Sequence, residues 1–372
     1  MNYFFHLFKS NTDLVVSFFL ALTSCFIPKT DPVNTVISIN YEILFLLMCL
    51  MIVVAGFRKI GVLDGIYKGC FKFVDNTRSL SRIFIFINFF ISMLITNDVS
   101  LIVFVPVAIR AFTCINRNDL IIPVVSMQTV AANMGSMLTP IGNPQNLYIY
   151  SYFNYQFTDF IFVTFPVFSV CFVLLYIATH FIDKSSLIID TDNKIVIPKK
   201  KAVLFCVLFI FCLLCVLRVI DIYILCLILF PVCFISDRKL FLKVDYKLLL
   251  LFVFLFILVG NLSKYDLVSS LAFEFVSEYE YFVSLCLSQI VSNVPATVML
   301  SSFTSDPDPL LVGVNVGGLG TIIASMASLI SFKYYVKIDG AKPLYYLKKF
   351  TKYNLRFLLV LVTLHFIFPD YF

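Results

Sequence analysis

The sequence of 372 residues has little charge and no tryptophan. Charged residues make up 13% of the chain, whereas soluble domains carry about 25%. Apolar residues make up 60%, and the mean hydropathy is +0.97. This composition excludes an ordinary soluble domain, because the excess of apolar surface has to face lipid. Without tryptophan, tyrosine and lysine have to anchor the chain at the membrane interfaces.

Other absences limit the catalytic and metal-binding sites that the chain can form. The three histidines, His6, His180 and His365, lie near the ends of apolar segments and indicate no histidine-based catalytic site. The close cysteine pair Cys212 and Cys215 lies inside an apolar run, where cysteine usually acts as a small apolar residue rather than a metal ligand. No DDxxD, GxSxG, HExxH or Walker A pattern is present, so we expect neither an enzyme nor an ATPase domain, and no cofactor.

The net charge of +6 does not indicate nucleic-acid binding, because the basic residues lie in loops between apolar runs. A bilayer crossing needs about 20 helical residues. We therefore predict an all-α polytopic protein of the cell membrane, with about nine full spans and two hairpins. The apolar runs are 14–28, 41–57, 81–95, 99–113, 119–150, 157–181, 202–219, 221–236, 247–262, 281–291, 294–304, 309–332 and 354–369.

The first apolar run allows two interpretations. Leu22-Thr23-Ser24-Cys25 loosely resembles a lipoprotein cleavage site, but only Lys9 supplies a basic region before the run. We expect the run to be a retained first span, with the N-terminus in the cytoplasm.

The region 81–113 is apolar at both ends and interrupted by Thr96-Asn97-Asp98. Each half has about 15 residues, or roughly 22 Å of helix, so neither half would span comfortably. This pattern predicts a re-entrant helical hairpin. Its polar tip can lie at membrane depth only if it is buried in protein or lines a cavity.

The region 119–150 would be roughly 48 Å long as a single helix, yet it contains Pro140 and Pro144. Proline removes a backbone donor and breaks helices. We therefore predict a discontinuous helix with an unwound stretch at Thr139–Asn146.

Both features recur later in the chain. Ser292-Asn293 interrupts the hairpin predicted at 281–304, and the discontinuous helix predicted at 309–332 is rich in glycine. Residues 133–147 align with 315–329, which indicates an internal repeat. The matched pairs are Asn133 with Asn315, Gly135 with Gly317, Thr139 with Thr321, and Asn143 with Ser325. The predicted units are an N-terminal repeat at 1–182, a cytoplasmic linker at 183–201 and a C-terminal repeat at 202–372.

The distribution of charge predicts the topology of the two repeats. With the N-terminus inside, all but three of the 28 Lys and Arg residues lie on the cytoplasmic side, which agrees with the positive-inside rule. The stretch before the first hairpin, 58–82, has a net charge of +4, and its equivalent, 263–282, has a net charge of −3. Equivalent elements on opposite faces indicate inverted-topology repeats, which place substrate and ion sites near the membrane midplane.

Asp98 is the one acidic residue predicted deep inside a membrane segment, where carboxylates are usually functional. It could bind Na⁺, carry a proton, or act as the N-cap of the second hairpin arm. Short-helix N-termini at the tips suit an anionic substrate, and unwound carbonyls at 139–146 and 317–324 suit Na⁺. Close helix packing is the alternative explanation for the glycines.

The predicted site for substrate and ion gathers the polar and glycine residues of both tips and both unwound stretches. Na⁺ is assigned to Asn97, Asp98 and Asn293. The full set is Thr96, Asn97, Asp98, Asn133, Thr139, Gly142, Asn143, Pro144, Asn146, Ser292, Asn293, Asn315, Gly317, Gly318, Thr321 and Ser325.

These residues give the chain a resemblance to the ion-transporter superfamily of citrate and divalent-anion symporters, arsenite pumps and some Na⁺/H⁺ antiporters. The stretches that carry it are ITNDVSLIVFVP (95–106), TPIGNPQNL (139–147), SNVPATVML (292–300) and NVGGLGT (315–321). The resemblance implies elevator-like transport coupled to Na⁺ or H⁺, often in a homodimer.

The match to the dicarboxylate branch is partial. Those symporters carry Ser-Asn-Thr at each hairpin tip, and Ser292-Asn293 matches the first two positions. Their unwound segment resembles Gly-Thr-Pro-Pro-Asn; here Asn143 replaces the threonine and Gln145 the second proline. The first tip, Thr96-Asn97-Asp98, instead resembles the Asn-Asp pair of the arsenite-pump branch.

The leading hypothesis is therefore a secondary transporter of a small anion, citrate or another carboxylate, coupled to Na⁺ or H⁺. The nearest alternative is an arsenite exporter or Na⁺/H⁺ antiporter that uses Asp98 for proton exchange. A third hypothesis is a membrane scaffold that transports nothing.

Overall fold

The computed structural model describes residues 12–26, 37–71, 74–187, 197–264, 273–274, 276–304 and 306–369. Over these residues the secondary structure is helical, apart from a single bridge between Asn76 and Ser186. This confirms the all-α prediction. The helices of the first half are α2 (Thr12–Ser24), α4 (Tyr41–Lys59), α5 (Val62–Phe71), α6 (Thr77–Ile91), α7 (Asn97–Cys114), η1 (Asn118–Leu120), α8 (Ile121–Ser136), η2 (Pro140–Gly142), α9 (Pro144–Tyr152) and α10 (Phe157–His180).

The described residues of the second half are helical as well. Its helices are α11 (Lys199–Val216), α12 (Ile222–Asp237), η3 (Arg238–Lys243), α13 (Tyr246–Leu262), α15 (Glu280–Val291), α16 (Asn293–Ser301), α17 (Pro307–Val316), α18 (Met326–Tyr335) and α19 (Pro343–Ile367).

Four of the described helices are long and apolar enough to cross a membrane: α4, α7, α10 and α19. The N-terminal run, α13 and α15 are apolar but shorter. The total of about nine full spans therefore stays a prediction.

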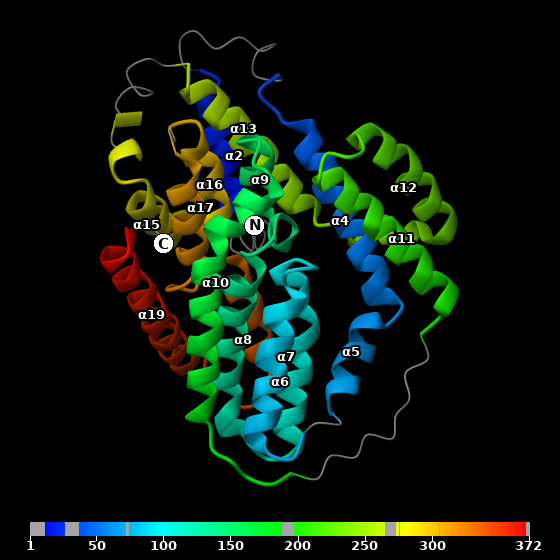
Figure 1. Ribbon diagram of the computed structural model, residues 1–372, viewed down its shortest axis with the longest axis vertical. Helices are drawn as coiled ribbons and strands as arrows, with labels where there is room; N and C mark the ends of the chain where they lie inside the picture. The colour runs from blue at the N-terminus through cyan, green and yellow to red at the C-terminus, as the bar shows by residue number, and fades with distance from the viewer. Residues whose placement is uncertain are drawn as a thin grey trace, which may run out of the picture.

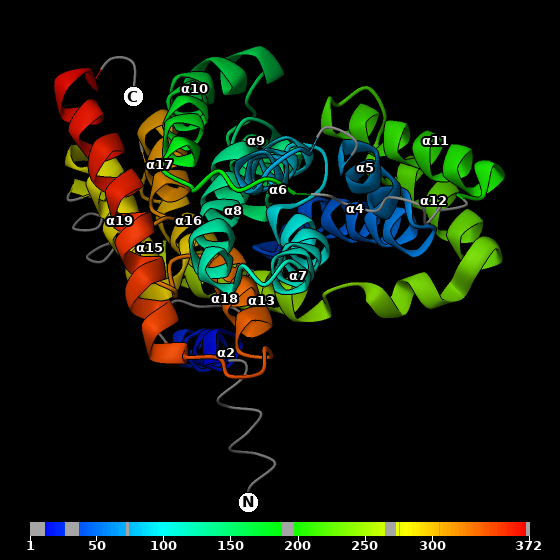
Figure 2. The ribbon, with the colours of Figure 1, turned by 90° about the horizontal axis from the view of Figure 1, so that it is seen from below.

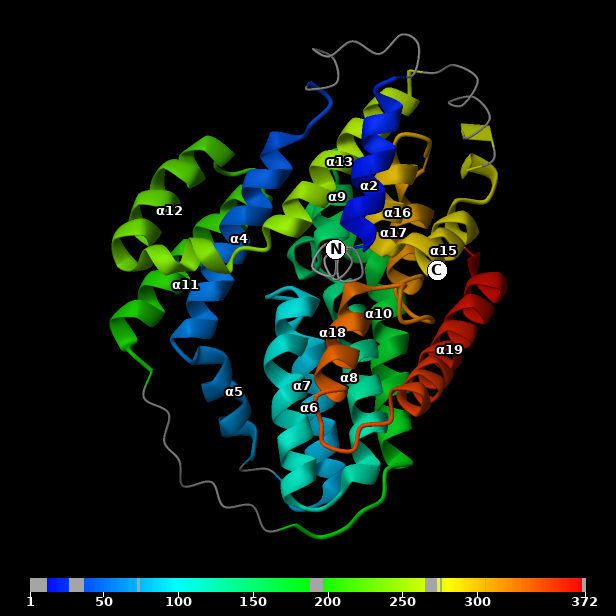
Figure 3. The ribbon, with the colours of Figure 1, turned by 180° about the vertical axis from the view of Figure 1, so that it is seen from behind.

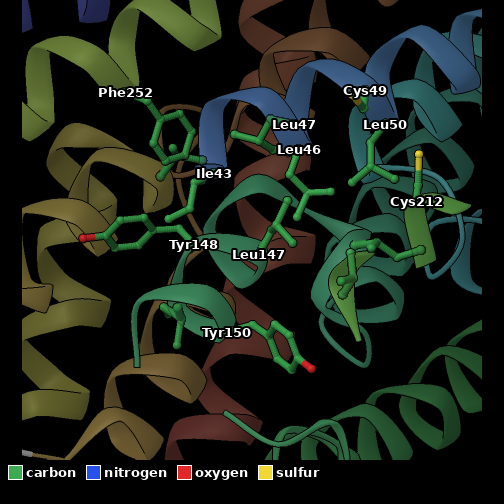
Figure 4. Packing of buried hydrophobic residues seen from close by; sticks show 14 of the residues in the cluster. Ile43, Leu46, Leu47, Cys49, Leu50, Leu147, Tyr148, Tyr150, Cys212 and Phe252 are labelled. Carbon is green, nitrogen blue, oxygen red and sulfur yellow. The ribbon is translucent and has the colours of Figure 1, made fainter. Parts of the chain in front are cut away.

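The helices form two groups that meet along α4, α9 and α13. Helices α4, α5, α11 and α12 lie together on one side of the molecule (Figures 1 and 2). One apolar cluster joins this group to α9 and α13. Figure 4 shows the junction, where Leu46 and Leu47 of α4 lie beside Leu147 of α9, and Phe252 of α13 lies near Ile43. A second apolar cluster holds α6, α7, α8, α10, α18 and α19 together.

The other group has an upper and a lower level. In Figures 1 and 3, α6, α7, α8 and α18 occupy the lower level, and α9, α15, α16 and α17 occupy the upper level. The chain interruptions lie where the two levels meet. We call 92–98 the first tip, Ser292–Asn293 the second tip, 137–143 the first break and 317–325 the second break.

The two arms of the first predicted hairpin differ in length. Helix α6 has 15 residues, as expected, but α7 has 18 and is long enough to cross a membrane. The expectation that neither arm could span is therefore wrong for α7. The extra length arises because Asn97 and Asp98 join the first turn of α7, where polar and acidic side chains are favourable.

The predicted linker 183–201 is structured at both ends. Residues 183–187 dock on the start of α6, where the Thr77 N–H donates to the Ser185 carbonyl (2.9 Å) and the Leu187 N–H to the Asp75 carbonyl (3.0 Å). Helix α11 begins at Lys199, directly after Pro198. The middle of the linker, 188–196, lies outside the described residues.

Candidate functional site

Asn133, near the end of α8, joins the first tip to the second break. Its Oδ1 accepts a hydrogen bond from Asn97 Nδ2 (2.9 Å) and another from Ser325 Oγ (3.1 Å). Its Nδ2 donates to the Gly318 carbonyl (3.2 Å). Two of these partners, Ser325 and Gly318, belong to the other half of the chain, so Asn133 is a link between the halves.

Asn315, the residue paired with Asn133 in the repeat alignment, makes the reciprocal link. Its Oδ1 accepts from Asn143 Nδ2 (3.2 Å), and its Nδ2 donates to Asn146 Oδ1 (2.7 Å). It also donates to the Leu311 carbonyl in its own helix (2.8 Å). The two matched asparagines, both buried, thus each contact the chain interruption of the opposite half.

The first break satisfies its backbone largely with its own side chains. Asn146 Nδ2 lies 3.4, 3.1 and 3.3 Å from the carbonyl oxygens of Ser136, Met137 and Thr139, respectively. Asn143 caps α9, since its Oδ1 accepts from the Asn146 N–H (2.9 Å). Because one amide already occupies these carbonyls, the break is pre-organised as a compact unit rather than an open set of cation ligands.

Two further residues fix the position of the first break. A Cβ placed on Gly142 would lie 2.1 Å from the Ser136 carbonyl oxygen, so only glycine fits there. Thr139 Oγ1 donates to the Met93 carbonyl in the first tip (2.5 Å). Pro144 follows as the first residue of α9, a position that suits proline because its N–H would have no helical partner.

The second break relies on a side chain from a neighbouring helix. Gln289 of α15 donates through Nε2 to the carbonyls of Gly317 (2.6 Å) and Leu319 (2.8 Å), and its Oε1 accepts from the Thr321 N–H (3.0 Å). Sequence reasoning missed Gln289. Its signal is an amide three residues before the second tip, in an otherwise apolar and small-residue helix.

The second tip is buried and packed against the second break. Ser292 has φ 75° and ψ 153°, and the Asn293 N–H donates to the Ala324 carbonyl (3.0 Å). A Cβ on Gly318 would lie 2.9 Å from Asn293 Nδ2, so the glycine lets the amide approach closely. Gly317 is equally confined, since a Cβ there would lie 2.8 Å from the Gly313 carbonyl oxygen.

The first tip, in contrast, lines a cavity of about 950 Å³. Thr96, Asp98 and Pro144 form its inner end, residues 50–59 of α4 form one wall, and residues 239–248 of η3 and α13 form another. Asp98 Oδ1 is buried and has no hydrogen-bond partner among the described residues. The N-cap of α7 is Thr96, so the interpretation of Asp98 as the N-cap is wrong.

The three residues assigned to Na⁺ are not joined in one cluster. Asn97 uses its Nδ2 on Asn133 and its Oδ1 on the Asp98 N–H (2.8 Å), whereas Asp98 lines the cavity. Asn293 lies across the second break, beside Gly318. A cation held by all three would therefore require rearrangement of Asn97, which leaves Asp98 as the group best placed for an arriving cation.

Comparison with known proteins places the chain in a family. A sequence profile for citrate transporters, CitMHS, matches residues 7–327. The chain belongs to the citrate transporter family. It is therefore a multi-pass membrane transporter, and the resemblance noted from the tips and unwound stretches is confirmed at the level of the superfamily.

Relatives of this chain occur in an archaeon and in two bacteria. The "Uncharacterized transporter MJ0456" of Methanocaldococcus jannaschii is 34% identical over 308 residues, which cover 82% of this chain and 83% of that protein. The "Inner membrane protein YbiR" of Escherichia coli is 28% identical over 315 residues, covering 83% and 82%. The "46 kDa membrane protein" of Mycobacterium leprae is 23% identical over 338 residues, covering 79% and 78%.

Proposed function

We propose that this chain is a secondary active transporter that moves a small anion of the citrate or dicarboxylate type, coupled to Na⁺ or H⁺. The observation that carries the proposal is the cavity that ends at Asp98 and at the starts of two helices. Helix α7 begins at Asn97 and α9 at Pro144, and residues beside both starts line the inner end of the cavity. The helix dipole favours an anion at a helix N-terminus, and it acts here although the N–H groups of Asp98 and Asn146 are already bonded to Asn97 and Asn143.

The position of Asp98 gives a physical reason for coupling. An anion that approaches the two helix starts also approaches the Asp98 carboxylate, and like charges repel strongly where water is scarce. A bound proton or Na⁺ removes this repulsion. The anion and the cation then occupy the inner end together, and each raises the affinity for the other.

The arrangement of the helices supports inverted repeats as the frame for transport. The first tip is reached from the lower level and the second tip from the upper level (Figure 1). The cavity is lined by the end of α4, on the basic, cytoplasmic side of the topology inferred from charge. We therefore assign this conformation to cytoplasmic access, in a cell-membrane protein with its N-terminus inside. A homodimer is the assembly that the resemblance implies, and it belongs to the same proposal.

Uptake by the purified protein in proteoliposomes tests the proposal. Citrate and succinate uptake should require a gradient of Na⁺ or H⁺, and Asp98→Asn should remove the dependence on that cation. Asp245→Asn is the matched control, because Asp245 lines the same cavity but caps α13 through the N–H groups of Lys247 and Leu248. Unchanged cation dependence in Asp98→Asn would exclude Asp98 from coupling.

The same experiment separates the second candidate function, arsenite efflux or Na⁺/H⁺ antiport. The unpartnered Asp98 oxygen beside Asn97 favours it, since a carboxylate that exchanges H⁺ and Na⁺ needs no anionic substrate. Exchange of Na⁺ against pH with no response to citrate or succinate would support antiport, and efflux of arsenite would support the pump.

A further inference from the structure

Basic residues from two distant segments gather around the cavity. Arg58 and Lys59 end α4, Lys239 and Lys243 belong to η3, and Lys247 lies in the first turn of α13. All five line the cavity. About 180 residues of sequence separate the two segments, so the fold, rather than a local charge run, brings them together.

Only part of this charge is neutralised locally. Lys59 forms an ion pair with Asp237. Asp245, an acidic residue of the cavity wall, accepts the N–H groups of Lys247 (3.1 Å) and Leu248 (3.2 Å) as the cap of α13. The side chains of Arg58, Lys239 and Lys243 are exposed, and within the described part of the chain they make no hydrogen bond or ion pair.

We propose that Arg58, Lys239 and Lys243 form an anion-capture site at the mouth of the cavity, which selects anions with two or three negative charges before they reach Asp98. This inference rests on the proposed function, because it takes the cavity as the route of the anion. It adds to that function the location at which the anion is first bound and a selectivity: the site captures polycarboxylates and does not capture monocarboxylates.

The selectivity follows from charge. Three cations around an aqueous mouth attract an ion in proportion to its charge, so a trivalent anion gains about three times the electrostatic free energy of a monovalent one. Fields of this kind raise the local concentration and association rate of an oppositely charged ligand by about 10 to 1,000-fold. Salt at 0.15 M screens charges beyond about 8 Å, so an anion that enters the mouth still interacts with them.

Thermal unfolding of the purified full chain in detergent tests the capture site without transport. At constant ionic strength, citrate should stabilise the protein at lower concentration than succinate, and acetate should have little effect. The triple variant R58Q/K239Q/K243Q should need about tenfold more citrate for the same shift, with its response to acetate unchanged. The control K348Q/K352Q/R356Q removes equal charge from α19, away from the cavity, and should respond like the native chain.

The variant Asp98→Asn distinguishes this inference from the proposed function. It should still respond to citrate in the unfolding assay, at the native concentration or a lower one, because the capture site remains and the charge that repels the anion at the inner end is gone, while it loses cation dependence in uptake. If Asp98→Asn abolishes the citrate response, binding at the inner end alone accounts for the stabilisation by citrate, and the capture site is overturned. Equal losses in the two triple variants, or no citrate response in the native chain, would overturn it as well.

An anionic lipid headgroup has similar chemistry and could occupy the same mouth. Reconstitution in phosphatidylcholine vesicles, with and without phosphatidylglycerol, separates the two sources. For a capture site that serves soluble anions, phosphatidylglycerol should raise the KM for citrate by the same factor in the native chain and in the variant, because the negative membrane surface repels citrate from both. If it raises the KM of the native chain but not that of the R58Q/K239Q/K243Q variant, the mouth is a lipid site and the proposal is wrong.

Discussion

The two tips occupy matched places in the sequence, but they differ in backbone and surroundings. Thr96 at the first tip has φ −54° and ψ 148°, an ordinary extended conformation, and it lines the cavity. Ser292 at the second tip has φ 75° and ψ 153° and is buried, while the next residue, Asn293, is hydrogen-bonded to the second break. One tip is thus open to a cavity and the other is buried, an asymmetry that agrees with the proposed access from the cytoplasmic side.

The two breaks differ in a related way. The first break is held by Asn143 and Asn146, which belong to the start of α9 itself. The second break is held by Gln289, which belongs to α15. A displacement of α15 would therefore pull on the second break, whereas the first break moves with its own helix. The aligned sequences thus form one break whose carbonyls are bonded by an amide of its own helix and one whose carbonyls are bonded by an amide of a neighbouring helix.

The largest effect is expected from adding a methyl group at each break. Gly142→Ala directs its Cβ at a backbone carbonyl 2.1 Å away, and this oxygen cannot move without shifting α8. We expect a loss of about 3 kcal/mol in the free energy of unfolding, or no folded protein. Gly318→Ala meets the end of the Asn293 side chain at 2.9 Å and the Asn315 carbonyl oxygen at 3.1 Å, both less close than the contact at Gly142, so its loss should be about 1 kcal/mol.

Thermal and urea unfolding in detergent, followed by circular dichroism, measures both variants. Equal losses would contradict the view that the first break is the more rigid of the two.

The second largest loss in the free energy of unfolding is expected at Asn315, which links the two halves of the chain. Asn315→Ala leaves Asn146 Oδ1 without its donor in a buried site, and an unsatisfied buried polar group costs about 1–3 kcal/mol. We expect a loss of about 2 kcal/mol in the free energy of unfolding. The control is Asn354→Ala on α19, a buried asparagine whose amide donates to a carbonyl of its own helix (3.0 Å). If Asn354→Ala loses as much unfolding free energy as Asn315→Ala, the link between the halves contributes no more to stability than an ordinary buried asparagine.

Gln289→Ala should loosen the second break while leaving the first intact. The Thr321 N–H loses its acceptor, whereas the Asn146 N–H keeps Asn143 Oδ1. We expect hydrogen exchange at Thr321 to accelerate about tenfold, equivalent to about 1.4 kcal/mol of local stability, with no change at Asn146. Exchange measured by mass spectrometry reports both sites, and acceleration at both would refute the claim that the breaks are held independently.

The position of the chain interruptions was readable from the sequence, because each depends on local residues. Pro140 and Pro144 cannot continue a helix, and the structure ends α8 and starts α9 around them. Ser292 and Asn293 interrupt an apolar run and lie where α15 ends and α16 begins. The pairing of Asn133 with Asn315 also came from the alignment, although their reciprocal contacts did not.

The rest depends on contacts between distant segments, which apolar runs do not encode. The sequence prediction made α7 too short because its first two residues, Asn97 and Asp98, are polar and were not counted in the apolar run 99–113. The role of Gln289 depends on partners about 30 residues away. The basic mouth of the cavity combines α4 with η3, and only the fold brings these segments together.

The smallest expected change in the free energy of unfolding comes from glycine substitutions at the two tips. The conformation of Ser292 belongs to a region that glycine occupies freely and other residues enter at a cost of about 1–3 kcal/mol. Ser292→Gly removes this strain but adds freedom to the unfolded chain, which costs about 0.5–1 kcal/mol. The net expectation is a gain of about 1 kcal/mol in the free energy of unfolding. Thr96→Gly, at an unstrained position, should only lose stability.

Strain of this kind persists only where the surrounding structure holds it, and here the holder is the bond from the Asn293 N–H to the Ala324 carbonyl. If the second tip opens in another conformation, the strain at Ser292 favours that opening. Ser292→Gly should then slow transport while it stabilises the fold, a combination that a purely structural turn would not produce. Uptake rates and unfolding curves of the Ser292→Gly variant test this expectation. If the variant is stabilised and its uptake is unchanged, Ser292 acts in folding alone.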